Sequence, residues 1–100
     1  MTSPQIQAIR ERYKRSFTEK IELITEHINA LPQAEAGVME SAHEMLHKLA
    51  GSSGMYGYDD IAVLCRVAML NAQQSKADVL IQNLSELKSA LEAYAHPSSV

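Results

Sequence analysis

The chain is poor in residues that interrupt or cross-link a fold. Its 100 residues include one cysteine, three prolines, four glycines and no tryptophan. The single cysteine, Cys65, excludes an intrachain disulfide and fits a reducing compartment. No apolar run approaches the roughly 20 residues that a transmembrane helix needs, and the first residues lack the apolar core of a signal peptide. These absences predict a cytoplasmic protein with no membrane partner.

An excess of positive charge is also missing. The chain has 9 Lys and Arg against 12 Asp and Glu, so its formal net charge is -3. Because the phosphate backbone of a nucleic acid favours basic surfaces, no nucleic acid partner is expected. The length predicts one domain over residues 1–100, and few breakers among many Leu, Ala, Glu and Lys favour helix over strand.

The apolar residues recur at helical spacing in four segments. The first repeat begins at Ile6 and Ile9 and continues to Leu31, after Ser3 and Pro4, which suit the N-cap and the first helical position. The predicted helices cover residues of about 4–31, 38–55, 59–73 and 76–95. Short connections between four amphipathic helices predict an all-α fold, an antiparallel up-down four-helix bundle.

The segment 38–55 contains the residues with chemical potential. Placing Leu46 and Leu49 in the core turns His47 roughly 130° away from it. His47 is therefore expected to be exposed, on the same side as Glu44, Lys48 and Gly51, and His43 lies one turn earlier, nearer the core margin.

Small residues follow at the end of the same segment, in the order Gly51, Ser52, Ser53, Gly54. Glycine within a helix costs about 1 kcal/mol relative to alanine, and a stable bundle does not need it. One interpretation is a smooth surface beside the imidazole, which the backbone of another protein can approach closely. The other is that the run only frays the helix end before Gly57.

Several of these residues form a recognisable motif. It comprises His47, the apolar Leu49, Gly51, the small Ser52 and Ser53, Gly57, Ile61 and Cys65. In this spacing the chain resembles the histidine phosphotransfer (HPt) domains of multistep two-component signalling. The motif covers about a fifth of the chain, and the four-helix pattern extends the resemblance over nearly all of it.

The resemblance implies a phosphocarrier rather than an autonomous enzyme. His47 would accept a phosphoryl group from a receiver-domain aspartate and pass it to an aspartate on another receiver. The implied partners are receiver domains of response regulators or of a hybrid sensor histidine kinase, and the chain would act as a monomer. The receiver would bring the Mg²⁺, so no cofactor or metal is expected on the chain itself. His43, Glu44, Lys48, Gly51, Ser52 and Gly54 would support the site or dock the partner.

Two positions depart from the family pattern. Many members have Lys three residues after the histidine, where this chain has Ala50. Members often have Gln or Glu four residues after the cysteine, bonding the inner ring nitrogen, where this chain has Met69. Lys48 is then the candidate for neutralising phosphate charge, and the ring of His47 must be oriented by water or by neighbouring main chain.

Two alternatives remain open. His43 to His47 spells HExxH, in which two histidines ligate Zn²⁺ and Glu44 activates water, but no third ligand follows at a metalloprotease spacing. The second alternative is a helical adaptor without chemistry, in which the exposed His47 is incidental.

Overall fold

The computed structural model describes residues 3–33, 36–74 and 76–96, and the described residues form helices and short turns. The elements are α1 (Pro4–Arg15), α2 (Phe17–Ala30), a 3-10 turn (Leu31–Gln33), α3 (Ala36–Met55), α4 (Asp59–Gln73) and α5 (Ala77–Ala95). None of the described helices is both long and apolar enough to cross a lipid bilayer.

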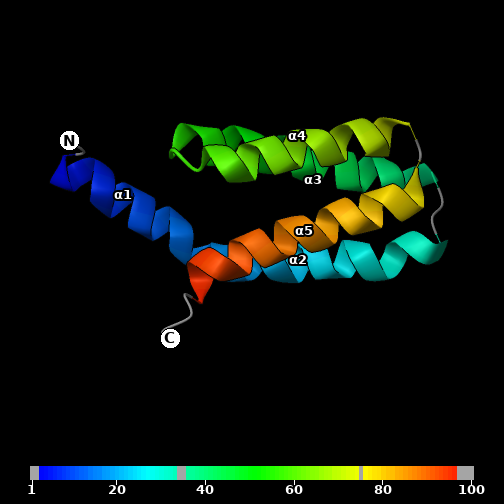
Figure 1. Cartoon of the computed structure of the whole chain (residues 1–100), viewed down its shortest axis with the longest axis horizontal. Helices are drawn as coiled ribbons and strands as arrows, with labels where there is room; N and C mark the ends of the chain where they lie inside the picture. The colour runs from blue at the N-terminus through cyan, green and yellow to red at the C-terminus, as the bar shows by residue number, and fades with distance from the viewer. Residues whose placement is uncertain (1–2, 34–35, 75, 97–100) are drawn as a thin grey trace.

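Four of these helices form an antiparallel bundle. In Figure 1, α3 and α4 make one layer and α2 and α5 make the other, and the chain reverses direction at each connection. α3 packs most closely against α4, and α5 packs against both α4 and α2. α2 and α3, in contrast, approach each other at few points. The predicted all-α, up-down four-helix bundle is confirmed.

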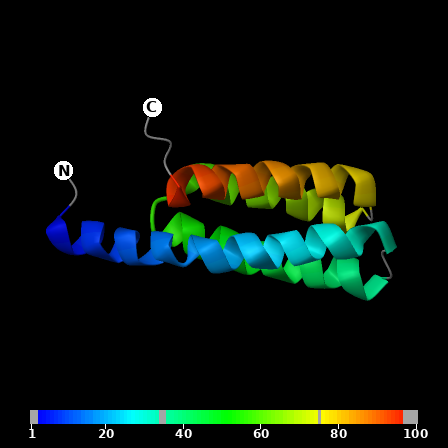
Figure 2. The same cartoon turned by 90° about the horizontal axis from the view of Figure 1, so that it is seen from below.

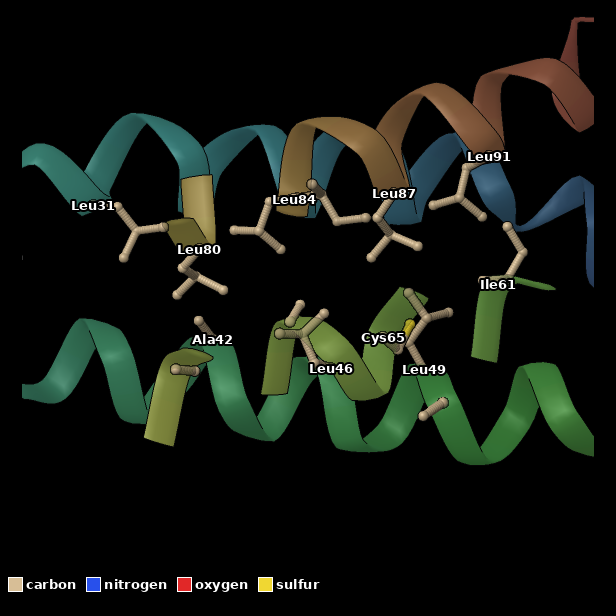
Figure 3. Packing of buried hydrophobic residues seen from close by; sticks show 14 of the residues in the cluster. Leu31, Ala42, Leu46, Leu49, Ile61, Cys65, Leu80, Leu84, Leu87 and Leu91 are labelled. Carbon is tan, nitrogen blue, oxygen red and sulfur yellow. The ribbon is translucent and has the colours of Figure 1, made fainter. Parts of the chain in front are cut away.

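The core lies between the two layers and consists mainly of leucine. Leu80, Leu84, Leu87 and Leu91 of α5 are fully buried, as their spacing in the sequence predicts. Figure 3 shows them facing the apolar residues of α3 and α4. The α3 stripe is buried as well, and it includes one polar residue, Ser53.

The first predicted helix is interrupted at Ser16, where α1 ends and α2 begins. The amide and the hydroxyl of Ser16 both donate to the carbonyl of Tyr13, at 2.9 and 2.6 Å. These contacts are made three residues back and tighten the backbone, which is how serine commonly bends a helix. The prediction of one continuous helix over residues 4–31 was therefore wrong, because the helix is broken at Ser16.

α1 projects beyond the end of the bundle, as Figures 1 and 2 show. Its N-terminus is as expected, because Ser3 is the N-cap and its hydroxyl accepts from the amide of Ile6 at 3.1 Å. Two residues of its apolar stripe lie outside the core, since Ile6 is 53% and Ile9 47% exposed. The core that would cover them ends before α1 does.

All five aromatic side chains gather where α1 meets the bundle. The ring of Tyr13 stacks on Tyr56 and meets Phe17 edge-on, and Phe17 in turn contacts Tyr58 and Tyr94. Edge-to-face pairs of this kind stabilise a fold by about 0.5–1.5 kcal/mol each beyond their burial. This aromatic cluster joins α1 and α2 to the α3–α4 turn and to the end of α5.

Arg10 also holds α1 against this aromatic cluster. Its Nε donates to the carbonyl of Tyr56 at 2.9 Å, and its guanidinium lies over the ring of Tyr58. The hydroxyl of Tyr58 donates in return to the carbonyl of Arg10. The turn itself needs Gly57, whose φ of 82° lies in the left-handed region that favours glycine.

Candidate functional site

His47 lies on the outer side of α3, near the middle of the bundle. Its side chain is exposed, whereas Leu46 and Leu49 on either side are buried. The outward direction that helical geometry predicts is therefore what the structure shows. Among the described residues, no hydrogen bond orients the imidazole ring. The ring is thus free to meet an incoming group.

Gly51, one turn further along α3, leaves open space beside His47. It is exposed, and a Cβ built on it would have no atom within 4 Å apart from its own helix backbone. Gly54 is partly buried, and a Cβ built on it would also meet nothing within 4 Å. No neighbour within the chain therefore requires glycine at either position, although each glycine weakens the helix. Because glycine has no side chain, the surface of α3 is recessed beside the imidazole.

The serines between these glycines connect α3 to α1. The hydroxyls of Tyr13 and Ser52 lie 2.5 Å apart, and those of Tyr13 and Ser53 lie 3.1 Å apart. Ser52 also donates to the carbonyl of Leu49 at 3.3 Å. The hydroxyl of Ser52 thus links α3 to Tyr13 of α1 and to the backbone of its own helix. The contribution of Tyr13 was missed from the sequence, because a contact across 39 residues leaves no periodic signal.

Lys48 and Glu44 form an ion pair on the exposed side of α3. Nζ of Lys48 lies 3.2 Å from the carboxylate of Glu44, one helical turn away, and the side chains are 75% and 67% exposed. An exposed pair at this spacing stabilises a helix by about 0.3–0.5 kcal/mol, so it separates readily. Glu44 therefore does not hold the ammonium of Lys48 firmly in one position.

His43 is placed differently from His47. It is half-buried, and its Nε2 is buried without a hydrogen-bond partner among the described residues. The two histidines of the HExxH motif therefore do not present their rings to a common exposed point. Within the ranges described, no three His, Cys, Asp or Glu side chains cluster as metal ligands would. The arrangement gives the zinc alternative no support.

The positions that depart from the HPt pattern both lie at the core. Ala50 is buried, and Met69 is half-buried and packs against the core cluster. A methyl group and a thioether offer the imidazole no strong hydrogen bond. Neither position can therefore orient the ring of His47 through a strong side-chain hydrogen bond.

Cys65 is a core residue and not part of the site. Burial raises the pKa of its thiol from 9.0 to about 12, a shift that the charge of Arg66 only partly opposes. The reactive thiolate is therefore scarce at neutral pH. The cysteine of the motif thus packs between helices as a small apolar residue.

A comparison with family models identifies the chain. The model of the Hpt domain matches residues 8–96, a range that contains all four helices of the bundle, including α3 with His47. Searches among curated proteins and among solved structures each returned no match. The match covers most of the chain and agrees with the helical fold described above, so the protein belongs to the Hpt domain family, whose members are phosphocarrier modules of phosphorelays.

Proposed function

We propose that the protein carries a phosphoryl group on His47 between the receiver domains of a two-component phosphorelay. The observation that supports this most directly is the exposed imidazole beside the open surface at Gly51, on a helix of a family whose modules transfer phosphate through histidine. The bundle holds α3 by its buried face and leaves the opposite face to the partner.

The transfer exchanges one bond to phosphorus for another. The lone pair of Nε2 attacks the phosphorus of a receiver aspartyl phosphate, an N–P bond forms, and the P–O bond breaks with its electrons left on the aspartate carboxylate. The neutral ring keeps its proton on Nδ1 during the attack. The second step reverses the first, with a carboxylate oxygen of another receiver as the nucleophile.

The groups around His47 fit a carrier that depends on its partner for catalysis. Phosphoryl transfer is accelerated mainly by positioning and by neutralising charge on the phosphoryl oxygens. The partner receiver supplies the Mg²⁺ and the acidic residues that bind it. Lys48 adds one positive charge beside His47 from the carrier, and Gly51 allows the receiver backbone to come close.

The test is phosphate transfer from every receiver domain of the genome that encodes the chain. Each receiver is phosphorylated with labelled phosphate and mixed with the protein in Mg²⁺. The wild type is expected to take up label that is acid-labile and base-stable, the behaviour of phosphohistidine. His47→Gln is expected to take up none. The matched control is His96→Gln, which removes another exposed histidine and should accept label normally.

Two outcomes would refute the proposal. One is label on His47→Gln at the wild-type level, which would place the phosphoryl group elsewhere. The other is a wild-type protein that no receiver labels, which would leave an adaptor without phosphate chemistry.

A further inference from the structure

The side of α3 that faces α4 follows from the contacts on its other side. Ser41 and Ser52 are hydrogen-bonded to side chains of α2 and α1, so they mark the side of α3 that faces those two helices. With about 3.6 residues per turn, Ala50 projects in nearly the opposite direction. Ala50 is buried, and α3 packs most closely against α4. Ala50 therefore faces α4, and the exposed His47, one turn earlier, lies at the outer edge of the same side.

The side of α4 that faces α3 can be found in the same way. Asp60 and Asn71 are hydrogen-bonded to side chains of α5, so they mark the side of α4 that faces α5. Ala62 projects in nearly the opposite direction and is buried, and α4 packs mainly against α3 and α5. Ala62 therefore faces α3. Arg66, one turn after Ala62, is exposed and lies at the outer edge of that side.

His47 and Arg66 also lie at the same level of the bundle. α3 ends at Met55 and α4 begins at Asp59, and the two helices run antiparallel side by side in one layer (Figure 1). His47 lies about 12 Å along the helix axis from Met55, and Arg66 lies about 10.5 Å from Asp59. The axes of packed helices are about 8–10 Å apart. Arg66 therefore lies opposite His47, across the line along which α3 and α4 meet.

The guanidinium of Arg66 is available to bind an anion. No carboxylate among the described residues lies within 4 Å of it. Lys48, in contrast, is paired with Glu44 and lines a hollow between α2 and α3, on the side of His47 away from α4. The two cations therefore flank the imidazole from different sides, and Arg66 is the one without an acidic partner.

An arginine at this place suits a phosphoryl group carried on His47. Its guanidinium is planar, keeps its charge at any pH at which the protein is folded, and can donate two parallel N–H bonds to phosphate oxygens. Its long side chain can bring the charge over the line between the two helices while the stem stays on α4. A phosphoryl group on the exposed ring nitrogen would place acceptor oxygens and negative charge at this edge, where the unphosphorylated chain has neither.

We propose that Arg66 binds the phosphoryl group on His47 and stabilises the phosphorylated form of the carrier. The inference rests on the proposed function and names the residue of α4 that serves it. Because the neutral imidazole offers the guanidinium no anion, the contact forms only after transfer. It therefore shifts the transfer equilibrium between receiver and carrier towards the carrier.

The experiment compares three substitutions of exposed arginines. Arg66→Gln removes the charge, and Arg66→Lys keeps the charge but loses the paired N–H donors. The matched control is Arg15→Gln, which makes the same change at an exposed arginine of α1. Neither arginine is buried, so all three variants are expected to fold, which circular dichroism checks.

The first readout needs no receiver. The protein is phosphorylated with phosphoramidate, a small donor that transfers its phosphoryl group to an exposed imidazole and releases ammonia. The phosphorus resonance that His47→Gln lacks is then followed against pH by nuclear magnetic resonance. A guanidinium against the phosphoryl group lowers the pKa of its last proton. The resonance of the wild type and of Arg15→Gln should therefore titrate at lower pH than that of Arg66→Gln, with Arg66→Lys between them.

Two features make this readout specific for a contact with the phosphoryl group. The other charged or titratable groups of α3 beside the site, His43, Glu44 and Lys48, are the same in every variant. A role of Arg66 in folding alone would leave the titration of the phosphoryl group unchanged.

The second readout is the equilibrium of transfer from a phosphorylated receiver. Arg66→Gln is expected to lower the equilibrium constant for transfer to the carrier about tenfold, since charge-assisted bonds to a phosphate are stronger than an ordinary exposed ion pair. Arg66→Lys should recover part of this loss, and Arg15→Gln should behave as wild type.

The outcomes separate this inference from the proposed function. The same phosphorus titration in the wild type and Arg66→Gln would overturn the contact and leave His47 as the acceptor. An equal shift in Arg15→Gln would assign the effect to net charge and overturn the contact as well. If no receiver labels the protein, the carrier function fails, and the titration of the protein phosphorylated with phosphoramidate still decides whether Arg66 binds the group.

Discussion

Replacing Gly51 with leucine should move the stability of the protein and its transfer rate in opposite directions. Gly51 is exposed within α3, and a Cβ there would meet nothing within 4 Å. Leucine is a good helix former, so the change should stabilise the fold by about 0.5–1 kcal/mol. For a domain of this size that raises Tm by about 2–5 °C. Thermal unfolding followed by circular dichroism measures it.

The same side chain should obstruct the receiver. The leucine side chain would project one turn from His47, where α3 now carries no side chain. Displacing the partner by roughly 1 Å is enough to lower the transfer rate about 100-fold. Gly37→Ala is the control, since Gly37 is equally unobstructed on α3 but about 15 Å from His47. A Gly51→Leu variant with higher Tm and wild-type transfer kinetics would refute the close-approach argument.

Two further predictions concern the core and the contact with α1. Because burial raises the pKa of Cys65 in the native state, the thiol keeps its proton there at pH values at which the unfolded chain loses it. The stability that the buried thiol contributes is therefore fully present below pH 9 and is lost as the pH rises towards 12. Between pH 8 and pH 10 the wild type should lose about 1 kcal/mol more than Cys65→Ala in urea unfolding, and equal losses would contradict this burial. Tyr13→Phe should destabilise the fold by about 1–3 kcal/mol, because it leaves the buried hydroxyl of Ser53 without its partner. Since Ser53→Ala removes that hydroxyl, the double variant should lose less stability than the two single losses added, and simple additivity would argue against the contact.

Most of the fold could be predicted from the local periodicity of the apolar residues. The four leucines of α5 and the stripe of α3 follow the helical repeat and are buried as expected. The direction of His47 followed from the same repeat, because helical geometry turns position 47 roughly 130° away from the core direction that Leu46 and Leu49 define. These features depend on neighbours within one or two turns, which the order of residues reports directly.

What could not be predicted depends on where one helix ends relative to another. Ile6 and Ile9 continue the apolar repeat of the first helix, but whether a repeat is covered depends on the length of the helices opposite it. The bend at Ser16 is equally hidden, since serine is tolerated within many straight helices. The contact of Tyr13 with Ser52 and Ser53 is hidden for a related reason, because it joins two helices that lie far apart in the sequence.

The gathering of the aromatic residues has a consequence for spectroscopy. The chain has no tryptophan, and its four tyrosines, Tyr13, Tyr56, Tyr58 and Tyr94, all belong to the aromatic cluster at the junction with α1. Near-ultraviolet dichroism and intrinsic fluorescence of the protein are therefore local reporters of that end. Both signals should change when α1 detaches, and should stay unchanged when the leucine-lined far half of the bundle loosens.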